Sequence, residues 1–117
     1  MIIEERCYTL APGNIDTYWA LYTPEIIAVM EPMRPHMLGY YISNTGMLNQ
    51  IVHLWRFENY AKREQKRAAL AANPAWQAHL GRIRKLCRKQ ETRILRPSPV
   101  AGLSPLADAT RTGATRN

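Results

Sequence analysis

A β-hairpin between residues 38 and 57 is the feature that most constrains the fold. The segments LGYYISN, residues 38–44, and NQIVHLWRF, residues 49–57, are rich in β-branched and aromatic residues, which favour strands. Asn44 and Gly46 lie between them and tolerate the positive φ of a tight turn. A short turn joins antiparallel neighbours, so the two segments predict adjacent strands of an antiparallel sheet.

The remaining segments predict two more strands and two helical regions. Residues 2–10 and 90–96 are predicted strands. Helical spacing and capping residues predict a helix over 15–22 and a second segment from Thr23 to Met30, which Pro32 and Pro35 end. Alanine, leucine and alternating charges predict helices over 59–72 and 75–87. The order is therefore β-α-β-β-α-β.

This order predicts an α+β, ferredoxin-like fold: a four-stranded antiparallel sheet with its helices on one face. The other face would be apolar and uncovered, and such faces usually meet a partner. We therefore expect a homodimer in which two sheets pack face to face as a dimeric α/β barrel. Residues 1–97 form the predicted domain, and residues 98–117 form a Pro-rich, polar C-terminal tail without a core of its own.

Alternation along residues 49–57 separates two faces of the strand. One face carries His53 and Trp55, and the other carries Val52 and Leu54. Because aliphatic pairs commonly pack beneath helices, we expect the helices to cover Val52 and Leu54, and His53 and Trp55 to face the second sheet. Cys7 is expected on the helix side as a small core residue.

The face that carries His53 and Trp55, extended to the neighbouring strands, predicts a candidate pocket of aromatic and polar side chains. Its predicted members are Arg6, Tyr8, His53 and Trp55, with either Tyr41 or Glu91. His53 is the natural proton carrier because its ordinary pKa lies near neutrality. Three alternatives stay open: a hydrogen-bonded interface histidine, a tryptophan that only packs, and an ion pair of Arg6 with Glu4 or Glu91.

The net charge of +7 is concentrated in residues 62–89, which hold nine Lys or Arg and a single acid, Glu64. Arg63 and Arg67 lie one helical turn apart and could bind an anion, although a solvated helix face is the simpler interpretation. Nucleic acid is an unfavoured partner because a dimer would bury the aromatic residues that stack on bases.

Other functional classes receive little support. No apolar run is long enough to span a bilayer, and no leader-like segment opens the chain, which predicts a cytoplasmic protein. Cys7 and Cys87 lack CxxC spacing and are expected to be free thiols. His36, His53 and His79 lack metal-ligand spacing, so neither a metal nor another cofactor is predicted.

The chain resembles the NIPSNAP family. The resemblance rests on residues 48–80, LNQIVHLWRFENYAKREQKRAALAANPAWQAHL, with support from residues 5–22, 38–41 and 90–97. It implies the dimeric α/β-barrel superfamily, whose members include cofactor-free monooxygenases, isomerases and haem-binding enzymes. The family has no agreed catalytic activity, so the resemblance implies a fold and not a reaction.

Two functions remain in competition. The first is a homodimer that binds a small apolar or aromatic molecule in a sheet-lined cavity, with cofactor-independent monooxygenase or isomerase chemistry in which His53 moves a proton. The second is a non-enzymatic interaction or scaffold protein, in which the same side chains are dimer core. A haem-binding variant would need His53 or His79 as a ligand.

Overall fold

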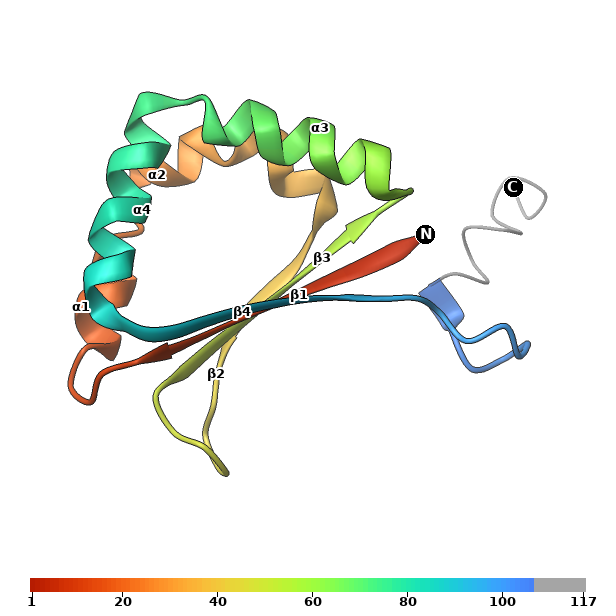
Figure 1. Cartoon of the computed structure of the whole chain (residues 1–117), viewed down its shortest axis with the longest axis horizontal. Coiled ribbons are helices and arrows are strands. Elements are labelled where there is room, and N and C mark those ends of the chain that lie inside the picture. Colours follow the sequence, from red (N-terminus) through yellow and green to blue (C-terminus); the bar gives the residue numbers. More distant parts are fainter. Residues whose placement is uncertain (107–117) are drawn as a thin grey trace.

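Four antiparallel strands form one sheet with the order β2-β3-β1-β4. The computed structural model describes residues 1–106, in which the helices lie together on one side of this sheet (Figure 1). The strands are β1 (Ile2–Leu10), β2 (Met37–Ile42), β3 (Gln50–Phe57) and β4 (Cys87–Leu95). This arrangement confirms the predicted α+β class and the β-α-β-β-α-β order.

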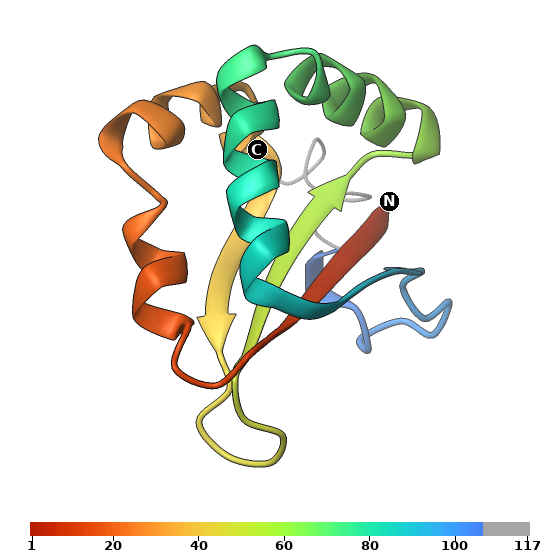
Figure 2. The same ribbon diagram turned by 60° about the vertical axis from the view of Figure 1, so that its left-hand side comes forward.

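The helical elements are α1 (Ile15–Ala20), α2 (Pro24–Val29), the 3₁₀ helix η1 (Glu31–His36), α3 (Tyr60–Ala71) and α4 (Pro74–Leu86). Side chains cap three of them: Thr23 accepts from the Ile26 amide, Asn59 from that of Lys62, and Asn73 from that of Trp76. Figure 2 shows α4 crossing in front of the sheet, with α1 and α2 beside it.

Several predicted boundaries need correction. The helix expected from Thr23 to Met30 ends before Pro32, since α2 stops at Val29, but the chain then forms η1, which contains Pro32 and Pro35 and was not expected. The first residues of a helix do not need their amide hydrogens for intrahelical bonds, so Pro32 is compatible with the start of η1. Cys87 is not the last residue of α4 but the first of β4, so the last strand begins three residues earlier than expected.

Of the two residues expected to allow positive φ in the hairpin turn, Gly46 has it and Asn44 does not. Asn49 adopts φ 62° and Gly46 φ 75°, both in the left-handed region. The hairpin register sets Tyr40 opposite His53 and Tyr41 opposite Val52. Tyr40 and His53 therefore share a face of the sheet, and Tyr41 lies on the other.

The core lies between the sheet and the helices, and it shows that the predicted face assignment was wrong. Ile51, Trp55 and Phe57 are buried beneath the helices, whereas Val52 and Leu54 are half-buried on the open face. The phase of the alternation was right but the choice of face was not. Tryptophan and phenylalanine remove far more apolar area from water than valine and leucine, which favours their placement inside.

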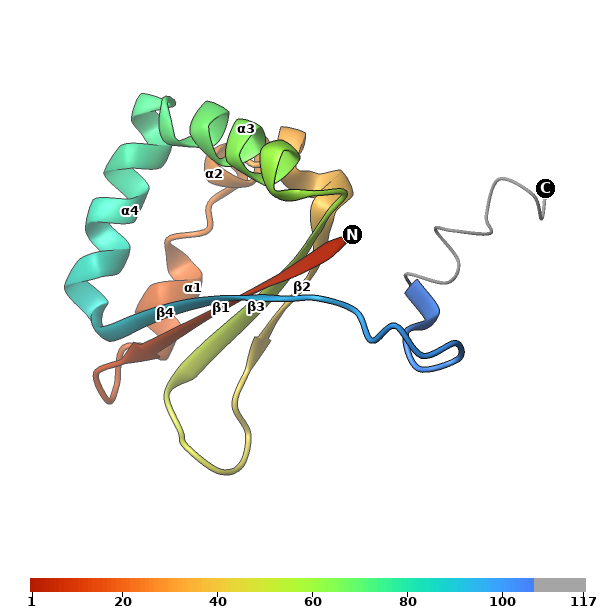
Figure 3. The same cartoon turned by 45° about the vertical axis from the view of Figure 1, so that its right-hand side comes forward.

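The open face of the sheet carries apolar side chains such as Val52 and Leu54 beside charged ones such as Glu5 and Arg93. Figure 3 shows α1, α2, α3 and α4 on the opposite side of the sheet. Cys7 is half-buried on this open face and is not a core residue as expected. Within residues 1–106 no helix has the length and apolar character needed to cross a membrane.

The chain beyond β4 contacts the domain. Residues 98–106 lie beside the beginning of β1 and the end of β4, where they line a groove with Ile3 and Leu95. The Ser98 amide donates to the Ser104 hydroxyl at 3.0 Å. The rest of the predicted tail, residues 107–117, lies outside the described residues.

Candidate functional site

A cavity of about 300 Å³ lies between the sheet and helices α3 and α4. Its volume is at the lower end of the range for small-molecule sites. The sheet contributes polar side chains and the helices contribute mainly apolar ones. The lining residues used below are Arg6, Tyr8, Tyr40, His53, Trp76 and Leu80.

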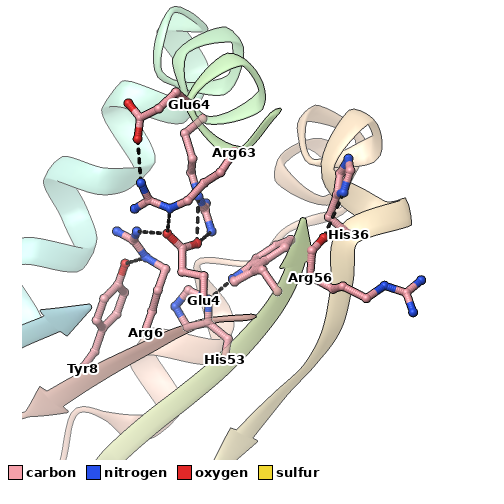
Figure 4. Close-up of polar contacts among 10 residues, drawn as sticks. Glu4, Arg6, Tyr8, His36, His53, Arg56, Arg63 and Glu64 are labelled. Carbon is pink, nitrogen blue, oxygen red and sulfur yellow. Dashed lines mark hydrogen bonds and ion pairs between the residues drawn. The ribbon is translucent and has the colours of Figure 1, made fainter. Parts of the chain in front are cut away.

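Glu4 is the centre of an ion cluster beside this cavity. Its carboxylate is fully buried and accepts from Arg63 Nε at 2.6 Å and from Arg67 Nε at 3.0 Å. Arg67 Nη2 donates to the same carboxylate, and Arg6 Nη1 lies more distant at 3.5 Å. Figure 4 shows the guanidinium groups of Arg6 and Arg63 reaching Glu4 from β1 and α3, respectively.

The positive charges keep Glu4 ionised. Burial by itself raises the pKa of this carboxyl group, but the charges of Arg67 and Arg6 and the hydrogen bonds from Arg67 and Arg63 outweigh it. The net pKa of Glu4 therefore lies below its ordinary value. A carboxylate so enclosed is stable only while its guanidinium partners remain.

His53 occupies the floor of the cavity. Its ring stacks on Tyr40, with centroids 4.3 Å apart and planes within 9°, and meets the edge of Tyr8 at 5.1 Å. Trp55 Nε1 donates to His53 Nδ1 at 2.8 Å. An indole N–H can only donate, so Nδ1 must be the acceptor and the neutral ring must carry its proton on Nε2.

The Nε2 atom of His53 is buried and has no hydrogen-bond partner within residues 1–106. Burial, Arg6 and Arg67 lower the pKa of His53 to about 2, so the ring is neutral at physiological pH. His53 is thus placed as a donor through Nε2–H, with no free lone pair to accept a proton. Its predicted role as a proton carrier stays untested, but this environment favours donation.

Arg6 and Tyr8 lie next to His53 on the same face. The register pairs Arg6 with His53 directly across strands β1 and β3. Arg6 Nε donates to the Tyr8 hydroxyl oxygen at 3.2 Å. The Tyr8 hydroxyl hydrogen is not used in that bond and remains available to a ligand.

The structure brings together Arg6, Tyr8, His53 and Trp55, as the alternation implied, but beneath the helices rather than between two sheets. Tyr41 and Glu91 are not with them. Tyr41 is 53% exposed on the opposite face, and Glu91 pairs in register with Cys7 there. The sequence named Tyr41 for the cluster, but the hairpin register places Tyr40 there instead.

Arg63 and Arg67 are not solvated residues of a helix face. Each side chain is 18% exposed, and the anion that both contact is Glu4 of the same chain. Arg67 also lies over the ring of Trp55, 4.7 Å from its centroid. The sequence offered Glu4 as an ion-pair partner of Arg6, and the structure shows that pair, but sequence reasoning missed the pairing of Glu4 with Arg63 and Arg67.

The cysteines and histidines show no metal centre. Within residues 1–106 no three His, Cys, Asp or Glu side chains group as metal ligands would. Cys7 and Cys87 are free thiols, and burial raises the pKa of both. Neither thiol is therefore activated as a nucleophile.

Comparison with known proteins assigns the family. The family model described as NIPSNAP matches residues 3–101, which is most of the chain. The chain belongs to the NIPSNAP family. A NIPSNAP family protein with unknown function from Agrobacterium tumefaciens is 34% identical with a TM-score of 0.77, covering 88% of this chain and 93% of that one.

A human NIPSNAP protein, NipSnap homolog 3A, is 31% identical over 75 residues. The match covers 63% of this chain but only 30% of the human protein, so the chain spans less than a third of that relative. An antibiotic biosynthesis monooxygenase has a TM-score of 0.59 at 16% identity. That last likeness shows a shared fold and nothing about the reaction.

We predict that acidification destabilises this NIPSNAP protein through its buried histidines. The folded pKa values are lowered to about 2 for His53 and about 4 for His79, so below pH 6.5 the unfolded state binds more protons. Stability is then lost as pH falls, by up to about 1.4 kcal/mol per pH unit for each histidine. Urea unfolding at pH 7 to 4 measures this slope, and His53→Phe should make it shallower. An unchanged slope in His53→Phe would show that His53 titrates normally.

Proposed function

We propose that this NIPSNAP protein binds a small aromatic molecule in the cavity between its sheet and helices α3 and α4, and that it does so as a homodimer. The observation that carries the proposal is the buried Nε2–H of His53 at the floor of that cavity, from which no residue of the described part of the chain accepts a hydrogen bond. Buried polar groups are nearly always satisfied, so an orphaned donor beside a cavity favours a missing acceptor.

The walls of the cavity favour an aromatic ligand. Tyr40 and Trp76 present ring surfaces, and Leu70, Leu80 and Ile83 add aliphatic ones. Aromatic and aliphatic walls with a few convergent polar groups are typical of sites for small planar molecules. The cavity lies within one subunit, which differs from the sheet-to-sheet cavity predicted from sequence.

The same donors define the chemistry that a catalytic version of this site would use. Arg6, Tyr8 and His53 could together stabilise an oxyanion that develops on a bound ligand, such as an enolate. Isomerase or cofactor-independent monooxygenase chemistry that passes through such an anion fits this site. Binding is the primary proposal, because no described carboxylate lining the cavity is free to act as a base: Glu64 pairs with Arg63 at 2.6 Å.

The homodimer is supported by the open face of the sheet. Val52, Leu54 and Tyr41 lie there, on the side of the sheet opposite to α1, α2, α3 and α4. Apolar side chains left on a sheet face without a covering layer are characteristic of a partner surface, and a second copy offers a matching set. A scaffold function would use this same interface without a ligand in the cavity.

We expect 2-naphthol, a neutral two-ring probe, to bind with one molecule per subunit in isothermal titration calorimetry. Ala71→Trp should abolish this binding, because residue 71 lines the cavity and is exposed enough to accept a large side chain without overpacking the core. Ala72→Trp is the matched control, since residue 72 is exposed and does not line the cavity.

The scaffold alternative predicts a different result. If wild type and both variants take up no probe while the dimer persists in native mass spectrometry, the cavity is not a ligand site. Equal loss of binding in Ala71→Trp and Ala72→Trp would also contradict the assignment, because the effect would then come from the helix end and not from the cavity.

A further inference from the structure

We propose that the ligand of this cavity is an aromatic carboxylate whose anionic group is held by Arg6, Tyr8 and His53. This inference rests on the proposed function and specifies the chemical class that the site takes. It follows from how the charges beside the cavity are paired, and from which hydrogen-bond donors remain unused.

The first step concerns the pairing of three guanidinium groups. Arg63 and Arg67 are committed to Glu4 through contacts that include Nε bonds of 2.6 and 3.0 Å. Arg63 uses Nη1 for Glu64 at 2.6 Å. These two arginines and the buried carboxylate therefore form a structural unit with little capacity left for a ligand.

Arg6 is the guanidinium group that remains. Its contact with Glu4 is a long 3.5 Å, to an oxygen that Arg63 already binds at 2.6 Å. Its Nε donates to a neutral hydroxyl, and within residues 1–106 its Nη2 has no hydrogen bond. Arg6 is 25% exposed and always protonated, so it is a largely enclosed cation without a strong anionic partner.

The second step concerns the neighbours of Arg6, which are donors. The Tyr8 hydroxyl accepts from Arg6 Nε and can donate its own hydrogen. His53 presents Nε2–H, because its Nδ1 is occupied by Trp55. In Figure 4 the second ring nitrogen of His53 lies on the side of Arg6 and Tyr8. One cation and two neutral donors thus adjoin one another at the sheet end of the cavity.

Donors without a nearby acceptor favour an anion. A neutral amide or alcohol would satisfy part of this set but would leave the charge of Arg6 uncompensated. A carboxylate has two oxygens and about four acceptor positions, which suits a guanidinium group and two further donors. The desolvation of the carboxylate is offset because its partners are already fixed by packing and hydrogen bonds.

The third step concerns the rest of the ligand. Beyond the donors the lining becomes apolar, with Trp76 and Leu80 from α4 facing Tyr40 from β2. The carboxylate would lie at the sheet and a planar apolar body would extend toward the helices. This polarity within one cavity distinguishes an aromatic carboxylate from an inorganic anion, which would leave the apolar walls unused.

The test compares 2-naphthoate with 2-naphthamide by isothermal titration calorimetry at pH 7. The two probes share shape and ring, and they differ in charge. We expect naphthoate to bind at least about tenfold more tightly, since hydrogen bonds to charged groups are about twice as strong as neutral ones. Arg6→Gln should remove this preference by weakening naphthoate far more than naphthamide, and circular dichroism verifies that the variant is folded.

Two further variants sharpen the result. Tyr8→Phe keeps the ring but removes the hydroxyl donor, and should weaken naphthoate more than naphthamide. Arg84→Gln removes the same charge from an exposed position on α4 outside the cavity, and should leave the preference intact. A preference lost in Arg84→Gln as well would indicate general electrostatic attraction, and would overturn the assignment to Arg6.

The outcomes separate this inference from the function on which it rests. Equal affinity for the two probes, or a preference for naphthamide, would overturn the carboxylate assignment and leave the aromatic pocket intact. Absence of binding by naphthoate, naphthamide and 2-naphthol together would overturn both.

Discussion

Glu4→Gln should destabilise the protein by about 3–5 kcal/mol, the range found when one partner of a buried ion pair is removed. Glu4 is fully buried, and its carboxylate receives hydrogen bonds from Arg63, Arg67 and Arg6. Glutamine keeps the shape but brings three guanidinium groups together around a neutral amide. Urea denaturation at pH 7 gives the free energy of unfolding directly.

Glu5→Gln is the matched control for that experiment. Glu5 is the adjacent residue of β1 and pairs with Arg93 at 2.7 Å on the open face, where Arg93 is 68% exposed. Solvent screens such a pair, so its loss should change the free energy of unfolding little. Equal losses in the two variants would contradict the assignment of a large stabilising role to the buried Glu4 cluster.

Leu54→Lys should convert the proposed homodimer into a monomer. Leu54 lies on β3, a central strand, and its side chain faces away from the helices. Packing two sheets face to face would bury one unpaired ammonium group from each copy, which should weaken the dimer at least about 100-fold. Light scattering coupled to size exclusion measures the change, and circular dichroism verifies that the monomer keeps its fold.

The control for Leu54→Lys is Ile27→Lys on α2. Ile27 is an apolar side chain with 42% exposure, but it lies on the helical side of the sheet. It should leave the dimer intact. A wild-type protein that is monomeric at every concentration tested would contradict the proposed role of the open face.

The order of strands and helices was predictable because it depends on local signals. The hairpin turn contains Gly46 and Asn49 at positive φ, and Asn59 and Asn73 cap the helices that follow them. Each signal lies within a few residues of the structure that it specifies. Because these signals are local, they were sufficient to predict the α+β class, which the structure confirms.

The face that the helices cover was not predictable from the alternation alone. A strand pattern separates two sets of side chains but does not state which set lies inside. Here the set with His53 and Trp55 is inside, because its large rings fill the layer beneath the helices and the polar members find partners there. Those partners, such as Arg67 for Glu4, come from α3 more than sixty residues away in sequence.

The members of the candidate site were only partly predictable for the same reason. Arg6, Tyr8, His53 and Trp55 follow from strand phase. Tyr40 could be assigned to the site only from the hairpin register. That Arg63 and Arg67 pair with Glu4, while Arg6 remains for a ligand, could be seen only from the position of α3. A charge that pairs with a buried residue and a charge in water are indistinguishable in sequence.

A crystal structure of the protein grown with 4-bromobenzoate tests the central claim most directly, because the anomalous signal of bromine locates the ligand without ambiguity. The account predicts one bromine position in the cavity of each subunit, between Tyr40 and the α4 residues Trp76 and Leu80, with the carboxylate on Arg6 and within hydrogen-bond distance of His53 Nε2. A cavity empty of ligand at concentrations well above those that saturate binding in solution, or bromine only on the open face of the sheet, would contradict it.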